Sequence, residues 1–80
     1  MKARIHITLK SGVLDPQGKA IQSSLGALGF SDVENVRQGK YIELDISADD
    51  RAKAHEQLTQ MCDKLLANTV IENYTIDLET

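Results

Sequence analysis

The chain turns from a strand into a helix within one short stretch, Gly12-Val13-Leu14-Asp15-Pro16-Gln17-Gly18. Asp15 is a good N-cap residue, because its carboxylate can accept hydrogen bonds from the free amides of the first helical turn. Pro16 then takes the first helical position, where its missing N–H costs nothing. Gly18 weakens a helix start by up to about 1 kcal/mol. A glycine kept there indicates that another backbone comes close, and we interpret it as a sign of an interface.

Regular patterns flank this stretch on both sides. From Met1 to Lys10 every second residue is apolar, which is typical of a strand with one buried face and one polar, here basic, face. After the stretch, a helix is predicted over about residues 16–28, and Gly29 can end it in a left-handed conformation. The apolar stripe that we expect to face the core is Ala20, Ile21, Ser24, Leu25 and Leu28.

The remaining elements follow the same logic. Residues 33–46 are typical of a β-hairpin around Gly39, for which a two-residue and a three-residue loop fit equally well. A second helix is predicted after Ser47-Ala48-Asp49-Asp50, a sequence similar to a capping box. A last strand covers about residues 70–78. The inward stripe of the second helix is Ala54, Leu58, Met61, Cys62 and Leu65, widened by Leu66.

The predicted order of elements is strand, helix, strand, strand, helix, strand. This order is typical of an α+β, ferredoxin-like βαββαβ fold, in which two helices cover one face of a four-stranded antiparallel sheet. The first and third strands should be neighbours, which brings Arg4, His6 and Lys10 near Glu43 and Asp45 on the uncovered face. We interpret that face as a solvated charged surface rather than a binding site.

Length and cysteine content bound the architecture. Eighty residues allow one domain, residues 1–80, whose core leaves only about 3–5 kcal/mol of net stability without reinforcement. A single cysteine excludes an internal disulfide, and no metal framework is present to replace it. Oligomerisation is the remaining common form of reinforcement. We therefore expect self-association into a dimer or a higher oligomer.

Charge and hydropathy exclude several classes of partner. The net charge of −3 argues against a nucleic-acid surface. No apolar run approaches the roughly 20 residues needed to cross a bilayer, and the first residues lack the apolar segment of a signal peptide. We expect no nucleic-acid partner, no membrane and a cytoplasmic location.

The sequence predicts no catalytic, cofactor-binding or metal site. Cys62 lies on an apolar stripe, where a buried structural thiol is the usual outcome. His55 and Cys62 are separated by roughly 10 Å of helical rise, too far to share a zinc ion. The stretch from Gly12 to Gly18 lacks the lysine and repeated glycines of a phosphate-binding loop, and the chain lacks the aromatic residues of an RNA-binding sheet.

Several stretches resemble the PurS family, the small subunit of phosphoribosylformylglycinamidine (FGAM) synthase. They span nearly the whole chain in the family's order. Thr69 stands where the family usually has proline, so the turn into the last strand is expected to be less rigid. The stretches are Leu9-Lys10-Ser11-Gly12-Val13-Leu14-Asp15-Pro16-Gln17-Gly18, Val36-Arg37-Gln38-Gly39-Lys40, Met61-Cys62-Asp63-Lys64-Leu65-Leu66-Ala67-Asn68 and Val70-Ile71-Glu72-Asn73-Tyr74.

The resemblance implies a role in de novo purine (IMP) biosynthesis. FGAM synthase is an ATP-dependent C–N ligase with glutamine as amide donor. In this family a large synthetase subunit binds ATP and magnesium, and a glutaminase subunit releases ammonia. The small subunit is non-catalytic, bridges the other two and helps ammonia transfer, so no active site or cofactor is expected in this chain alone. A domain similar to a fused pair of such subunits occurs in single-polypeptide enzymes, which agrees with a dimer.

Our hypothesis for the partner interface rests on the opening stretch, with two basic residues as secondary candidates. Arg37 can make a forked contact to a partner carboxylate, and a solvated charge explains it equally well. The alternative function is a small metabolite-binding regulatory domain, which rests on analogy with other ferredoxin-like dimers. The interface candidates are Gly12, Val13, Leu14, Asp15, Pro16, Gln17, Gly18, Arg37 and Lys40.

Overall fold

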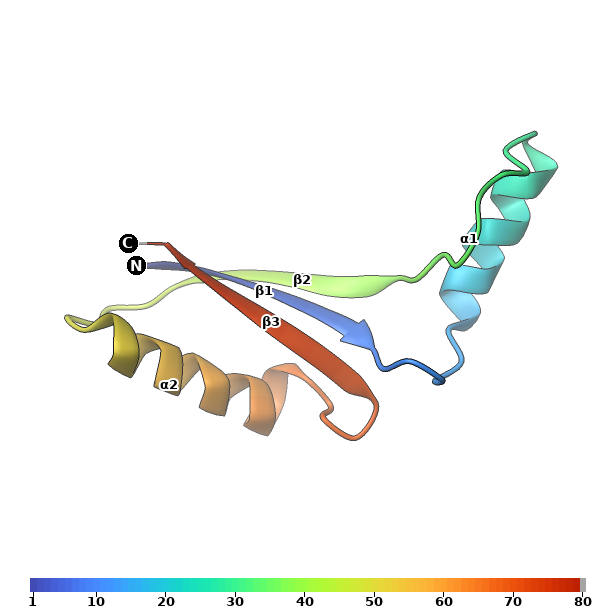
Figure 1. Ribbon diagram of the computed structural model, residues 1–80. Helices are drawn as coiled ribbons and strands as arrows, with labels where there is room; N and C mark the ends of the chain where they lie inside the picture. Colours follow the sequence, from blue (N-terminus) through green and yellow to red (C-terminus); the bar gives the residue numbers. More distant parts are fainter. Residues whose placement is uncertain (80) are drawn as a thin grey trace.

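A computed structural model describes residues 1–79 of the chain. Its strands form a three-stranded antiparallel sheet in the order β2-β1-β3 (Figure 1). One helix, α2, lies along one face of this sheet, and the other helix, α1, projects away from it. The elements in chain order are β1 (Lys2–Leu9), α1 (Pro16–Ala27), β2 (Gly39–Asp45), α2 (Arg51–Met61), the short π-helix η1 (Cys62–Leu66) and β3 (Glu72–Glu79).

The core lies between the sheet and α2. The inward residues of the central strand β1, Ala3, Ile5 and Ile7, are 0% exposed, as the alternation predicts. From α2 and the start of η1, Ala54, Leu58 and Cys62 meet them and are also 0% exposed. We call β1, β2, β3, α2 and η1 together the body of the molecule. Within the body, the sequence patterns predict the inward face of β1 and the burial of Ala54, Leu58 and Cys62 correctly.

The prediction of a four-stranded sheet is wrong. The structure assigns no strand to residues 31–38, and β2 begins only at Gly39, which pairs directly with Thr8 of β1. Asn35 has a φ of 55°, in the left-handed region, which interrupts an extended backbone. There is therefore no hairpin around Gly39, and neither of the two proposed loop lengths applies.

The prediction that two helices share one face of the sheet is also wrong. Residues 10–38, which we call the arm, leave the sheet at the ends of β1 and β2 and carry α1 away from it (Figure 1). The stripe expected to face the core is left largely uncovered, with Ile21 at 40% and Leu28 at 72% exposure. Gly29 does end the helix segment in a left-handed conformation, with a φ of 100°. The described chain measures 50 × 25 × 14 Å along its principal axes because the arm extends it.

The sheet face opposite α2 carries charged side chains. Arg4 lies in register with Glu43 and Asp77, and its Nη1 atom is 2.6 Å from Oε2 of Glu79. The predicted proximity of Arg4 to Glu43 is confirmed at 4.0 Å between Nε and Oε1. Such exposed ion pairs add little stability. In the part of the chain that the structure covers, no helix is both long and apolar enough to span a membrane.

Candidate functional site

The two ends of the arm meet around the carboxylate of Asp15. This side chain is 6% exposed; its Oδ1 atom accepts a hydrogen bond from the Gly18 N–H and its Oδ2 atom one from the Gln38 N–H, both at 2.8 Å. These two bonds, first that from Gln38 and then that from Gly18, hold the pKa of the Asp15 carboxyl below its usual value. Asp15 is thus the predicted N-cap of α1 and also a link to the segment that enters β2. We call Asp15, Gly18, Arg37 and Gln38 the clasp.

Arg37 closes the clasp from the other side. Its Nη2 atom donates to the carbonyl oxygens of Leu9 at 3.0 Å and Lys10 at 3.1 Å, and its Nη1 atom donates to that of Val13 at 3.3 Å. Its Nε atom lies 4.0 Å from Oδ2 of Asp15. The fixed fork of a guanidinium suits several acceptors at once. The side chain therefore ties the segment that enters β2 to the segment that leaves β1.

Gly18 fits into the clasp only because it has no side chain. A Cβ atom at this position would overlap the carbonyl oxygen of Val36 and would lie 2.7 Å from Oδ2 of Asp15. The close backbone that the sequence indicated at Gly18 therefore belongs to the same chain. Gly12 has open space around it and a φ of 88°, so it serves the turn after β1. Both glycines shape the base of the arm.

The other interface candidates surround the clasp without belonging to it. Leu14 is 64% exposed, and Pro16 and Gln17, also exposed, begin α1. Lys40 lies at the start of β2, where its Nζ atom is 3.4 Å from Oε2 of Glu72. An open cavity of about 510 Å³ separates the clasp from β3, lined by Ile7, Leu9, Asp15, Pro16, Gln17, Gln38, Gly39, Lys40 and Glu72. The structure thus brings the predicted interface residues together at one end of the sheet.

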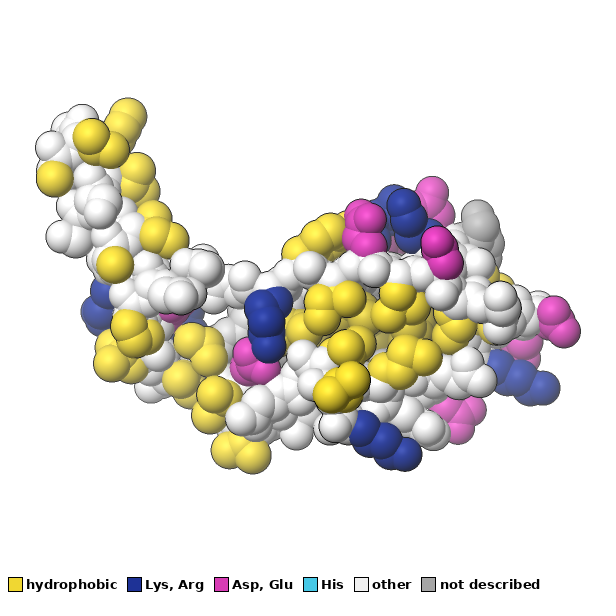
Figure 2. Space-filling view, turned by 180° about the vertical axis from the view of Figure 1, so that it is seen from behind, with side chains coloured by type: hydrophobic (Ala, Val, Ile, Leu, Met, Phe, Trp, Pro, Cys, Tyr) yellow, Lys and Arg dark blue, Asp and Glu magenta, His cyan; other side chains and the backbone are white. Residues whose placement is uncertain are grey.

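A second surface, which the sequence patterns did not predict, lies on the body beside α2. Leu44, Met61, Leu65 and Leu66 line an open groove of about 440 Å³ together with Gln57, Gln60 and Lys64, and we call it the groove. Figure 2 shows hydrophobic side chains gathered on this side of the body, below a cluster of charged ones. Leu65 is 83% and Met61 37% exposed, so the prediction that both face the core is wrong.

The sequence held a signal for the groove. Leu65 and Leu66 are adjacent, so they lie about 100° apart around a helix and make the apolar stripe wide enough for part of it to extend beyond the core. The helix widens there into η1, where the Ala67 N–H donates to the Cys62 carbonyl oxygen at 2.9 Å. This wider turn shifts the angular positions that a 3.6-residue period predicts. Cys62 stays in the core and Leu65 turns outward.

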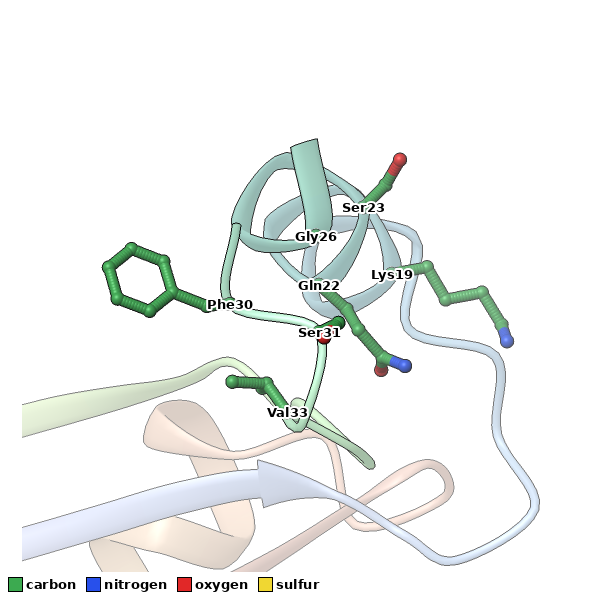
Figure 3. Close-up of a pocket in the computed structure, with 7 residues that line it drawn as sticks. All are labelled: Lys19, Gln22, Ser23, Gly26, Phe30, Ser31 and Val33. Atoms are coloured by element: carbon green, nitrogen blue, oxygen red, sulfur yellow. The ribbon is translucent and has the colours of Figure 1, made fainter. Parts of the chain in front are cut away.

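The arm itself carries a third hollow, of about 430 Å³, between α1 and the chain that returns from it (Figure 3). Gln22 and Gly26 face Ser31 and Val33 across it, and the ring of Phe30 points away from the helix. Phe30 is 58% exposed. The Val36 N–H donates to Oε1 of Gln22 at 3.4 Å, which joins the returning chain to α1.

The clasp holds backbone segments of the arm in place, and the groove presents an apolar surface. The Cys62 thiol is buried, and burial raises its pKa, which disfavours the reactive thiolate. Within residues 1–79, no group of three or more His, Cys, Asp or Glu side chains is placed to hold a metal ion. The clasp uses its one carboxylate and its one guanidinium to bind backbone groups. Its geometry is that of a support for the arm.

Known proteins match this chain over nearly its whole length. Residues 2–80 match the model of the PurS family, described as phosphoribosylformylglycinamidine (FGAM) synthase. The chain is 57% identical over 75 residues to the PurS subunit of this synthase from Synechocystis, which covers 94% of this chain and 75% of that protein. The solved PurS of Bacillus subtilis covers 99% of this chain and 98% of its own, with 46% identity and a TM-score of 0.89. A chain in the structure of PurLQS from Thermotoga maritima covers 95% of this chain and 93% of its own, with 34% identity and a TM-score of 0.88.

Proposed function

The chain belongs to the PurS family, and from this premise we propose that it is the non-catalytic subunit that bridges the synthetase and glutaminase subunits of FGAM synthase. As a PurS subunit it is part of a ligase complex of purine biosynthesis. The observation that carries the proposal is the match to a chain of a PurLQS assembly over 95% of this chain. A bridging role also agrees with a clasp whose side chains bind backbone groups of the same chain and with the apolar side chains exposed on the surface. We propose this role for the arm and the body together.

The shape of the chain supports contact with more than one partner. The arm and the body leave the clasp in different directions, so their exposed surfaces are separated along a molecule whose longest dimension is 50 Å (Figure 1). We place the contact with partner subunits at the exposed residues around the clasp, chiefly Leu14, Pro16 and Gln17, with Arg37 and Lys40 beside them. A clasp that fixes the arm would also fix the distance between two partners that bind on either side of it.

Ammonia transfer completes the proposed role. Ammonia that escapes into water is protonated and lost, so a bridging subunit contributes most by closing the path between two active sites to solvent. In this proposal the synthetase subunit binds ATP and magnesium, and this chain binds no cofactor. Self-association and a cytoplasmic location also belong to the proposal; the free thiol of Cys62 fits a reducing compartment.

The test is reconstitution with the synthetase and glutaminase subunits of the same organism. We expect that omission of this chain abolishes FGAM formation from glutamine and leaves formation from added ammonium salt unchanged. Leu14→Asp should weaken capture of the partner subunits, whereas Val70→Asp, at a residue 80% exposed on the turn before β3, should not. Equal glutamine-dependent turnover with and without this chain would show that the bridging proposal is wrong.

A further inference from the structure

The cavity between the clasp and β3 is large enough for a small molecule. Its volume of about 510 Å³ lies within the range that ligand-binding sites occupy. Leu9 and Pro16 give it an apolar wall. Gln17 and Gln38 line it on the side of the clasp, and Glu72 lines it on the side of β3. An apolar wall with a few polar groups around it is the usual composition of a small-molecule site.

An ion pair lies at one side of this cavity. Nζ of Lys40 is 3.4 Å from Oε2 of Glu72, which is longer than the distance of about 2.8 Å in a charge-assisted hydrogen bond. The Lys40 side chain is 56% exposed, and that of Glu72 is 13% exposed. Oε1 of Glu72 accepts a hydrogen bond from the Asn68 N–H at 2.6 Å, which fixes the carboxylate. Both charged groups therefore keep capacity for a further hydrogen bond.

The carboxylate of Glu72 is charged at neutral pH. The Asn68 N–H first, and Lys40 after it, holds the pKa of Glu72 below its usual value. Asp15 also lines the cavity, but its two oxygens already accept the N–H groups of Gly18 and Gln38. The cavity thus presents one ammonium and one carboxylate side by side.

These groups match the chemistry of an α-amino acid with an amide side chain. Its ammonium and carboxylate are attached to one carbon, so they lie side by side, as those of Lys40 and Glu72 do. Its carboxylate can approach Lys40 and its ammonium can approach Oε2 of Glu72, in charge-assisted hydrogen bonds. Its methylene groups can pack on Leu9 and Pro16. The amide at its end donates and accepts hydrogen bonds, as do the side-chain amides of the two glutamines in the wall.

Charge argues against other classes of small ligand. Among the lining residues, all of which lie within the described chain, Lys40 is the one cation, and Asp15 and Glu72 are anions. A phosphate or nucleotide would bring further negative charge to a cavity with a single ammonium. A side-chain carboxylate on the amino acid would do the same. A zwitterion with a neutral amide adds no net charge.

We propose that this cavity binds a free α-amino acid with an amide side chain, through Lys40, Glu72 and the side-chain amides of Gln17 and Gln38. The site lies beside the exposed residues at which we place the contact with partner subunits, so its occupancy would alter the surface that those subunits meet. This inference goes beyond the bridging role. Binding is measured on this chain alone and bridging on the reconstituted complex, so failure of one is distinguishable from failure of the other.

The first test is a titration of the ¹⁵N-labelled chain with L-glutamine, followed by NMR. We expect saturable shifts of backbone amides around the cavity, with a dissociation constant below about 10 mM, because an open cavity and a ligand of few atoms give weak affinity. Three analogues should bind at least about tenfold more weakly: glutaric acid monoamide, L-glutamine α-amide and L-alanine. They lack the α-ammonium, the α-carboxylate and the side-chain amide, respectively.

Two results of this titration would overturn the proposal. One is the absence of saturable shifts around the cavity up to about 20 mM L-glutamine, a concentration that would half-fill any site of comparable affinity. The other is equal affinity for L-glutamine and glutaric acid monoamide, which would remove the recognition of the zwitterion.

The second test uses variants of the ion pair. Glu72→Gln removes the charge and keeps an oxygen that can accept the Asn68 N–H, and Lys40→Met removes the ammonium. Each should weaken L-glutamine binding at least about tenfold. Lys53→Met and Glu56→Gln make the same changes at exposed positions of α2 and should leave the affinity unchanged. Unchanged affinity of Lys40→Met would contradict the assignment, and this variant, at an exposed side chain, decides it even if Glu72→Gln does not fold.

Discussion

The body and the arm both contain amphipathic elements, but only the elements of the body bury their apolar side within the chain. Each has an element with apolar residues on one side, β1 and α2 in the body and α1 in the arm. In the body that side is buried, with Ile5 and Leu58 both 0% exposed, whereas in the arm Leu28 remains 72% exposed. The comparison teaches that periodicity identifies the face of an element that needs a partner. It does not identify which element, or which molecule, supplies that partner.

The largest expected effect tests whether the stability of the chain comes from the body. Leu58→Ala should cost about 2–5 kcal/mol, because it leaves a cavity at a fully buried site, and should leave much of the chain unfolded. Leu28→Ala in the arm should change the free energy of unfolding by less than about 0.5 kcal/mol. Urea unfolding at several protein concentrations separates folding from association. Similar losses for the two variants would erase the distinction between body and arm.

A smaller effect tests how the arm is joined to the body. Gly18→Ala should destabilise the chain by about 1–3 kcal/mol, since its methyl group has to displace the Val36 carbonyl oxygen or the Asp15 carboxylate. Gly26→Ala lies in the same helix with open space around it and should stabilise the chain by up to about 1 kcal/mol. Thermal unfolding of the two variants measures the difference in sign. A neutral Gly18→Ala would show that the clasp tolerates a side chain and that the glycine is kept for another reason.

The smallest expected effect concerns pH. The folded pKa of Asp15 lies below its usual value of about 3.9. The stability that its carboxylate contributes is therefore fully present above that value and is lost as the pH falls toward the lower, folded pKa. Asp15→Asn keeps only one acceptor oxygen, so we expect the gap in unfolding midpoint between the two proteins to be widest near neutral pH and to narrow below about pH 4. Asp45→Asn, at an exposed residue, serves as the control. If the difference in unfolding midpoint between the unmodified chain and Asp15→Asn did not change with pH, the Asp15 carboxylate would not be the source of the stability.

Features of the fold that depend on neighbouring residues in the sequence could be predicted from the sequence. Alternation predicted β1 and the inward residues of β2, and Asp15 with Pro16 predicted the start of α1. Each of these signals depends on neighbours within a few positions. The burial of Cys62 was predicted in the same way and is confirmed at 0% exposure. The family was also recognised from the sequence, on motifs that the comparisons confirm.

The candidate site was predicted only in outline. The sequence singled out Asp15, Gly18 and Arg37, but not the backbone groups that join them, the Val36 carbonyl and the Gln38 N–H. Backbone partners leave no mark in the residue pattern, because every residue except proline offers the same N–H and C=O. The groove was missed because η1 turns Leu65 out of the stripe that an ideal helix would form.

The sequence by itself determined the strand β1 and the starts of the two helices, which faces of these elements are apolar, and to which family the chain belongs. Only the tertiary structure decided that residues 31–38 form no fourth strand and that α1 leaves the sheet. The physical reason is the range of the forces. Caps and alternation act over one or two turns of chain, whereas the direction of the arm depends on Asp15 reaching Gln38 and on Arg37 reaching Leu9, contacts between residues more than 20 positions apart.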